Sequence, residues 1–203
     1  PPLAEAPVRL RAWRSADEAA LVASCRDPLI DRYTHVPSPY RASDARAWVA
    51  GQGDRLRSGL SLDLAIADLA TDELLGAIGM HAFRWQDRRA EVGYWLAPEA
   101  RGRGVATCAL RLLSRWALAN LGLARLDLFA EEENVASVRV AERAGFVREG
   151  LLRSYIEIKG RRRSVLVFSL LAHDVASGGE SGTRPLPDAA RPAARHRAPR
   201  RQP

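Results

Sequence analysis

Apolar residues recur along the chain with two periods, one typical of strands and one typical of helices. Residues 8–13 alternate between apolar and polar, as in a strand with one buried face. From Val105 onward the apolar positions follow a helical period until Gly122. These positions are Val105, Ala109, Leu112, Leu113, Trp116 and Ala117. Because the two patterns alternate over most of the chain, they predict a mixed α/β fold.

The same patterns predict about seven strands and about four helices. Strands are expected at residues 8–13, 62–68, 74–83, 90–96, 125–130, 146–158 and 164–172, with turns at 70–73, 85–88 and 159–163. Helices are expected from a Ser15/Glu18 capping box to Asp27, from Ser43 through Trp48 to Gly51 or Gly59, over 105–121 and over 134–144. Residues 31–41 are rich in proline and aromatic side chains and are predicted to be irregular. The result is a mixed, mostly antiparallel central sheet flanked by helices.

The segment from Arg101 to Thr107 joins a predicted strand to the long helix and contains two closely spaced glycines, Gly102 and Gly104. Such glycines let successive N–H groups turn toward one anion at the positive end of a helix. Arg101 and Arg103 add positive charge. An ordinary glycine turn is the alternative, and the loop matches neither the Walker pattern nor the dinucleotide fingerprint. The segment therefore predicts a diphosphate site of another kind.

Arg101, Gly104 and Ala106 match the Arg/Gln-x-x-Gly-x-Gly/Ala loop of the GNAT superfamily of acetyl-coenzyme A-dependent N-acetyltransferases, which this chain resembles. A second match lies in residues 134–137 and 144–150, which are similar to the RimJ/RimL branch that acts on protein N-termini. The resemblance implies a GNAT-type sheet in which the strand before the loop separates from its neighbour and exposes backbone to the pantetheine arm. It also implies acetyl-CoA as co-substrate. Expected cofactor contacts are Trp95, Leu96, Ala97, Arg101, Gly102, Arg103, Gly104, Val105, Ala106, Thr107, Asn134 and Ser137.

Glu91 is the expected general base. It lies on the strand that leads to the loop, where several superfamily members carry a glutamate that acts through water. A solvated residue paired with Arg84 or Arg89 is the alternative reading. Glu157 is a reserve candidate on a late strand, where a shift of one residue would turn its carboxylate to the other face of the sheet.

Ser137 is the second expected catalytic residue, because RimJ/RimL relatives carry a serine there, near the sulfur of coenzyme A. A serine that only caps or packs is the alternative. Many superfamily members have a tyrosine general acid where this chain has Ala141, and many relatives of the branch have a glutamate where it has Cys108. Tyr94 and Trp95 are interpreted as packing residues whose backbone alone contacts the pantetheine arm.

The acceptor is expected to bind among aromatic residues of the irregular segment and the helix after it, since loops on a rigid sheet usually carry recognition. The expected residues are Tyr33, His35, Tyr40 and Trp48. At pH 7 a lysine costs about 4.6 kcal/mol to neutralise and an α-amine about 1.1 kcal/mol. The weak acid/base set therefore favours a protein N-terminus. A small amine, such as an aminoglycoside, polyamine or amino-acid-like metabolite, and a non-catalytic acetyl-CoA-binding module are the alternatives.

Composition favours one catalytic domain over residues 1–175 and a disordered arginine- and proline-rich tail over 176–203. The chain has 203 residues, of which 47% are hydrophobic, and a net charge of +7 that lies mostly in the tail. The pattern favours a cytoplasmic protein without a membrane segment or specific nucleic-acid partner, and it leaves a homodimer open. Cys25 and Cys108 are expected to stay unpaired, and no cluster has metal-ligand spacing.

Overall fold

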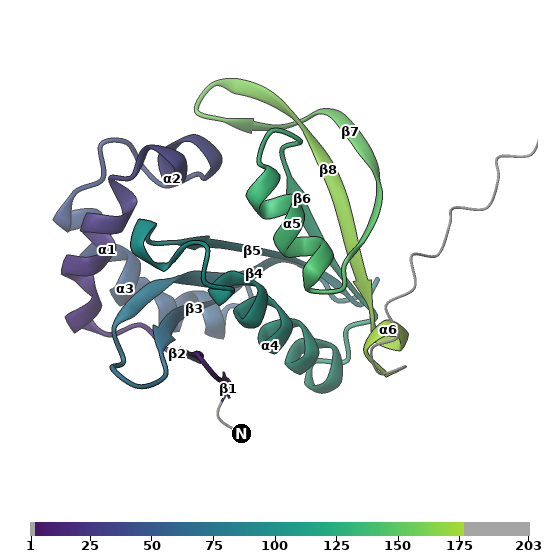
Figure 1. The fold of residues 1–203 in the computed structure, drawn as a ribbon, viewed down its shortest axis with the longest axis horizontal. Helices are drawn as coiled ribbons and strands as arrows, with labels where there is room; N and C mark the ends of the chain where they lie inside the picture. Colours follow the sequence, from purple (N-terminus) through teal and green to yellow (C-terminus); the bar gives the residue numbers. More distant parts are fainter. Residues whose placement is uncertain (1–2, 177–203) are drawn as a thin grey trace, which may run out of the picture.

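An eight-stranded mixed sheet forms the centre of the computed structural model, which describes residues 3–176 (Figure 1). The strand order is β1-β2-β3-β4-β5-β6-β8-β7, and only β5 and β6 pair in parallel. The strands are β1 (Leu3–Glu5), β2 (Val8–Arg11), β3 (Ser61–Asp68), β4 (Leu74–Arg84), β5 (Arg89–Leu96), β6 (Arg125–Ala130), β7 (Val147–Ile158) and β8 (Arg161–Leu171). The expected mixed, mostly antiparallel sheet is confirmed.

Helices cover both faces of this sheet (Figure 1). They are α1 (Glu18–Cys25), α2 (Pro28–Tyr33), α3 (Ala42–Arg57), α4 (Val105–Asn120), α5 (Val135–Arg143) and α6 (Ala172–Ala176), with short 3-10 turns at Ser15–Asp17 and Pro98–Ala100. The amphipathic face of α4 packs Val105, Ala109, Leu110 and Leu113 against the larger core. Leu21 and Cys25 of α1 and Ala45 of α3 belong to a smaller core on the opposite face.

Alternation along β4 assigns its side chains to these two cores. Ile78 and Met80 are buried in the larger core, whereas Ala77 faces the smaller one. The period of two residues in a strand therefore places Gly79 and His81 on the same face as Ala77. That face looks toward α1 and α3, and it lines part of the cavity described below.

The sheet opens between β5 and β6. The two strands pair only at Arg89↔Arg125, Ala90↔Leu126 and Glu91↔Asp127, although β5 runs on to Leu96 and β6 to Ala130. On its other side β5 stays paired with β4 as far as Leu96. One edge of β5 is thus left without a neighbouring strand beyond residue 91. The separation expected for the strand before the glycine loop is confirmed.

Several local predictions were wrong. The strand β1 was missed, so the sheet has eight strands. Residues 31–33, which were predicted to be irregular, belong to α2. Pro28 lies in the first turn of α2, and the carboxylate of Asp27 caps the helix. The helix has only six residues, which is too short for its apolar residues to show a helical period. The expected turn at 159–163 is shorter, because residues 161–163 already belong to β8.

The first two helix starts were also misplaced. Asp17 rather than Glu18 accepts from the backbone at the first start, where the N–H of Arg14 donates to it at 2.9 Å. At the start of α3, Asp44 has the same capping role, because its carboxylate accepts a hydrogen bond from the N–H of Arg41 at 2.8 Å. The first helical turn is a 3-10 turn at Ser15–Asp17 that leads into α1 at Glu18, and α3 begins at Ala42, before the predicted Ser43 cap. In both cases an aspartate three residues into the turn satisfies the orphan backbone donor. The tail was predicted over residues 176–203; Ala176 is the last residue of α6, and the rest of the tail lies outside the described residues.

Candidate active site

A cavity of about 980 Å³ fills the opening between β5 and β6 and extends under α2 and α3. We call its two parts the loop end and the floor end. The loop end lies between the chain before α4 and the helix α5, and it is lined by Gly102, residues 104–107, Asn134, Ser137, Arg139 and Arg143. The floor end lies on the sheet, and it is lined by Asp63, Gly79, His81, Glu91 and Gly93 with side chains of α2 and α3 above them.

Backbone N–H groups are the main polar feature of the loop end. Gly102 and Gly104 have φ values of 74° and 78°, the left-handed region that glycine reaches without strain. Cys108 is the first residue of this segment whose N–H has a partner, donating to the carbonyl of Gly104 at 3.0 Å. No acceptor within residues 3–176 pairs with the N–H groups of residues 102–107. Six successive donors at the positive end of a 16-residue helix are therefore free for an anion.

The two arginines of the loop lie in different places, Arg101 in the cavity lining and Arg103 outside it. The guanidinium of Arg101 donates to Asp27 at 2.6 Å and to the carbonyl of Leu96 at 3.0 Å. The same interaction lowers the pKa of Asp27 below its usual value. Arg103 lies outside the cavity, in a separate hollow that also includes Glu99. The positive charge of Arg101 is thus already neutralised, and it fastens the loop to the start of α2.

The remaining predicted cofactor residues divide in two groups. Trp95 and Leu96 line the cavity, whereas Ala97 is buried behind it and its N–H donates to the carbonyl of Leu75 at 2.9 Å. Asn134 caps α5, its side-chain oxygen accepting from the N–H of Ser137 at 3.2 Å. Both Asn134 and Ser137 also line the cavity, so Asn134 caps α5 while it remains in the cavity wall.

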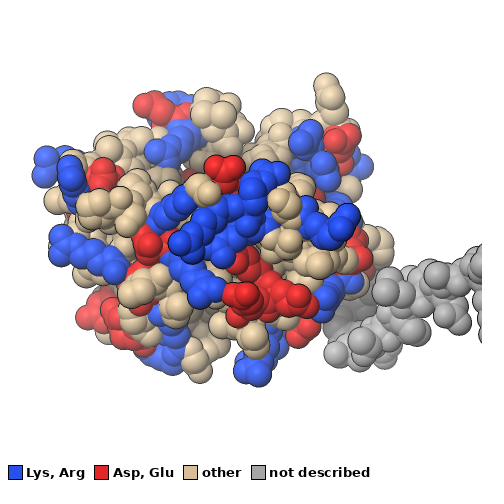
Figure 2. All heavy atoms as spheres, turned by 90° about the horizontal axis from the view of Figure 1, so that it is seen from above, with Lys and Arg blue, Asp and Glu red and all other residues tan. Residues whose placement is uncertain are grey.

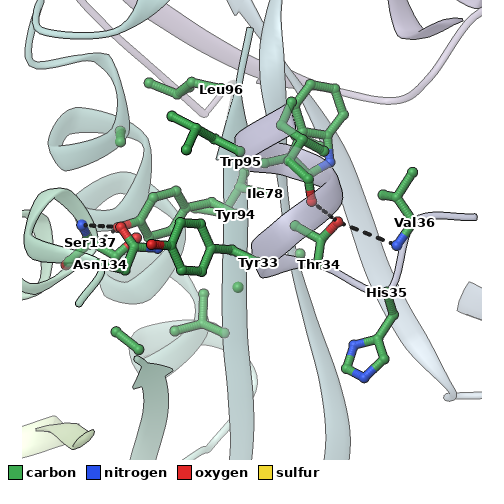
Figure 3. Close-up of a pocket in the computed structure, with 18 of the residues that line it drawn as sticks. Tyr33, Thr34, His35, Val36, Ile78, Tyr94, Trp95, Leu96, Asn134 and Ser137 are labelled. Carbon is green, nitrogen blue, oxygen red and sulfur yellow. Dashed lines mark hydrogen bonds between the residues drawn. The ribbon is translucent and has the colours of Figure 1, made fainter. Parts of the chain in front are cut away.

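Tyr94 contributes a side chain to the site, which the sequence analysis did not expect. Its hydroxyl approaches the carbonyl of Ser137 at 3.5 Å, the long limit of a hydrogen bond. Burial raises the pKa of Tyr94 to about 12, so the phenol stays protonated at neutral pH. The hydroxyl ends of Tyr94 and Tyr33 point toward Asn134 and Ser137 (Figure 3). Ala141, at the position where many superfamily members carry a tyrosine, lies on α5 one turn after Ser137 and is fully buried.

The floor end has a base of two glycines. Gly79 and Gly93 are directly opposite each other on β4 and β5, and Asp63 of β3 is opposite Gly79. A Cβ at residue 79 would meet Asp63 Oδ1 at 2.3 Å, so the carboxylate of Asp63 lies over the missing side chain. Ser61 donates to Asp63 Oδ2 at 2.6 Å, and burial raises the pKa of the Asp63 carboxyl. Oxygen Oδ1 has no hydrogen-bond partner within the described residues.

Glu91 lies on the same face of the sheet in the next row. Its carboxylate is 3.5 Å from Nε2 of His81, the residue opposite it on β4. The alternative pairing with Arg89 is not found, since Arg89 contacts Asp87 and Asp127 instead. Glu91 lines the cavity and its side chain is 31% exposed, so a base role is open to it. The side chain of Glu157 lies outside the cavity lining, which its neighbours Ile156 and Ile158 share.

The four residues expected around the acceptor all line the cavity. Tyr40 is 7% exposed and packs in the smaller core, and Trp48 is covered by the guanidinium of Arg55, whose carbon is 4.4 Å from the ring centroid. His35 Nε2 is 3.1 Å from the carbonyl oxygen of Glu157, which ties the chain after α2 to β7. His35 and Tyr33 lie on different sides of Thr34 in the cavity wall (Figure 3).

Comparison with known proteins decides the family. The model of the acetyltransferase (GNAT) domain matches residues 8–147. The chain belongs to the GNAT family. It is similar to the N-acetyltransferase p20 of Bacillus licheniformis, with 31% identity over 167 residues that cover 82% of this chain and 94% of that protein. It is also 34% identical over 82 residues to the ribosomal-protein-serine acetyltransferase of Escherichia coli, covering 40% of this chain and 46% of that protein.

A solved structure of the family agrees in fold. The structure of Mycobacterium smegmatis RimJ in complex with CoA-disulfide matches with a TM-score of 0.73 and 24% identity, covering 84% of this chain and 88% of that chain. The expected GNAT assignment and its RimJ/RimL-like character are confirmed, and the protein is an N-acetyltransferase. Within the described residues no group of three metal-binding side chains is found, and no helix is long and apolar enough to span a membrane.

Sequence reasoning missed several cavity residues of this GNAT domain. Asp63 gave no signal, because it is one polar position in an apolar strand. Arg139 and Arg143 did carry one, since a spacing of four residues puts both on one face of α5. Glu131, at the end of β6, is 9% exposed, with Oε2 3.4 Å from Arg163 and Oε1 without a partner.

Proposed function

We propose that this GNAT protein transfers the acetyl group of acetyl-CoA to a primary amine, with the N-terminal α-amine of a protein as the acceptor. The observation that carries the donor is the run of six unpartnered N–H groups at residues 102–107. They fit a diphosphate, because glycine angles at 102 and 104 turn the backbone toward the cavity and the helix adds its positive end. The free edge of β5 fits an extended amide chain such as pantetheine.

This arrangement supports a direct transfer in which the amine nitrogen attacks the thioester carbonyl. The carbon–nitrogen bond forms, the carbon–sulfur bond breaks, and its electron pair stays on sulfur. Tyr94 and Ser137 stabilise that sulfur by donating hydrogen bonds from their hydroxyls. A phenol with a pKa of about 12 keeps its own proton against a thiolate of pKa near 8.5, so the proton that ends on sulfur comes from the amine. Glu91 passes that proton on through water.

An acceptor amine that loses its proton easily places the smallest demand on Glu91, the proposed base. Glu91 shares its carboxylate with His81 and stands partly exposed. An α-amine is closer to neutral at pH 7 than a lysine by about 3.5 kcal/mol. Lys and Arg side chains gather in a broad band on the face seen from above (Figure 2). Arg153, Arg161 and Arg162 are exposed on β7 and β8, whose hairpin contacts α2. A cationic surface on these strands disfavours a free polycation and accommodates an acidic protein.

A small amine is the second candidate, and Asp63 is the observation that favours it. Its unpartnered oxygen on the glycine floor can receive a second ammonium group of a small acceptor. The two candidates differ in which acceptor is turned over. Coenzyme A release should be measured with a panel of N-terminal peptides, both acidic and basic, and with polyamines, aminoglycosides and amino acids.

Turnover of peptides supports the first acceptor, and turnover of small amines alone replaces it with the second. Acetyl-CoA binding without turnover of any amine contradicts the transfer. If neither acetyl-CoA nor coenzyme A binds, the donor assignment is wrong as well.

A further inference from the structure

The loop end lacks formal positive charge where the loop itself meets the cavity. Arg101 is paired with Asp27, and Arg103 lies in another hollow. Backbone N–H groups carry only partial charges, which suit the single charge on each phosphate of a diphosphate. Coenzyme A also carries a 3′-phosphomonoester, whose charge is about −1.5 to −2 at neutral pH. A group of that charge needs fully charged donors close by.

The cations that line the cavity within residues 3–176 are Arg55, Arg101, Arg139 and Arg143. Arg55 lies over the Trp48 ring at the floor end, and Arg101 is neutralised. Arg139 and Arg143 remain, and neither has a carboxylate partner in the described part of the chain. They stand four residues apart on α5, so their Cβ atoms are about 6 Å apart on one helix face.

The position of this pair relative to the N–H groups is set by packing of α4 on α5. The guanidinium of Arg111, on α4, donates to the carbonyl of Arg143 and holds the last turn of α5 against α4. Thr107, the last of the free N–H donors, and Val140 and Arg143 of α5 all line the cavity. A ligand whose diphosphate occupies these N–H groups can therefore place its nucleoside beside α5.

We propose that Arg139 and Arg143 form a phosphomonoester clamp that binds the 3′-phosphate of the acetyl-CoA nucleoside. The clamp rests on the proposed donor, and it adds a selectivity: the protein distinguishes coenzyme A from 3′-dephospho-coenzyme A. Two guanidinium groups on one helix face can each present paired N–H donors to the phosphate oxygens. The loop positions the ligand by binding its diphosphate, and the clamp distinguishes coenzyme A from 3′-dephospho-coenzyme A by binding the 3′-phosphate.

Binding of coenzyme A and of 3′-dephospho-coenzyme A should be measured by titration calorimetry for the full chain and for Arg139→Gln, Arg143→Gln and the double variant. The wild type should bind coenzyme A about 100-fold more tightly than the dephospho compound, and each single variant should lose about tenfold in coenzyme A affinity. The double variant should bind both compounds within about twofold of each other, with the dephospho affinity unchanged. Arg115→Gln, which removes an exposed α4 arginine outside the cavity lining, should bind both compounds as the wild type does.

Three results overturn the clamp. Equal wild-type affinity for the two compounds contradicts it while the proposed donor stands. Equal loss of both compounds in the double variant shows that the arginines act on the diphosphate or on the fold, which a thermal melt of the variant separates. Failure of the wild type to bind either compound removes the donor itself, and the clamp with it.

Discussion

The two ends of the cavity are built from different parts of the polypeptide. The loop end presents main-chain N–H groups from one continuous segment, whereas the floor end presents side chains from β3, β4, β5, α2 and α3. Main-chain donors are held by backbone angles and change little when side chains change. Side-chain donors depend on the register of three strands and on the seating of two helices. A GNAT domain of this form can therefore keep its donor while its acceptor varies.

The largest effect is expected from a change of backbone angle at the loop end, which tests whether main-chain N–H groups bind the donor. Gly104→Val places a β-branched residue at φ 78° and a side chain over the free N–H groups. We expect coenzyme A affinity to fall about 100-fold or more, measured by titration calorimetry. Gly122→Val is the matched control, since Gly122 has φ 65° and lies outside the cavity lining. It should lower stability and leave affinity alone; unchanged affinity in the Gly104 variant would remove the loop from the site.

A second change tests whether chemistry is separable from donor binding. Tyr94→Phe and Ser137→Ala each remove a hydroxyl that faces the expected position of sulfur. We expect kcat to fall about 10- to 100-fold in each case, with coenzyme A affinity within about twofold of the wild type. Tyr155→Phe, on an exposed ring that packs at a tilt of 36° against Phe129, should change neither quantity. If kcat of the Tyr94 variant equals that of the wild type, Tyr94 has only a packing role.

Asp63→Asn tests the floor end, and it should weaken acceptor binding while it raises the melting temperature. It keeps an acceptor for Ser61 but loses the charge, so the KM for a small diamine should rise about tenfold, while the KM for an N-terminal peptide and the coenzyme A affinity stay constant. Because burial raises the pKa of Asp63, its ionised form destabilises the native state. The favourable contribution is complete below about pH 3.9 and is lost as pH rises through the raised value.

The melting temperature of the Asp63 variant should thus exceed that of the wild type by about 2 °C at pH 8, and the difference should shrink toward pH 4. Asp54→Asn on the exposed face of α3 is the control, with no expected change in KM. A variant that loses stability at pH 8 would contradict the raised pKa of Asp63. One that keeps the wild-type KM for a small diamine would contradict a role for Asp63 in binding that acceptor.

The smallest expected effect concerns the contact that joins the two ends. Asp27 accepts from Arg101 of the loop and caps α2, which carries Tyr33. Asp27→Asn should cost about 0.5–1 kcal/mol of unfolding free energy at pH 7. Since the pKa of Asp27 is lowered in the native state, its contribution is present above about pH 3.9 and is lost as pH falls through the lowered value. Denaturant melts of both proteins at pH 7 and pH 3 check this; a gap that persists at pH 3 would point to the cap instead.

The loop end could be predicted from the sequence because its information is local. Gly102 and Gly104, the strand before them and the apolar period of α4 stand within about 30 residues, and backbone angle follows directly from glycine. What failed there was side-chain direction: Arg101 turns to Asp27, which is 74 positions away in the chain. The floor end could be predicted only as a set of aromatic residues. Asp63 became visible once the register of β3 on β4 set it over Gly79, and no local pattern encodes that register.

The carboxylate of Asp63 occupies the volume that any side chain at residue 79 would need, with 2.3 Å between its Oδ1 and a Cβ built there. An alanine at 79 requires the Asp63 carboxylate to move or to be replaced, because the two groups cannot occupy the same volume. We therefore expect the residues at 63 and 79 to change together, and with them the charge at the floor end of the cavity.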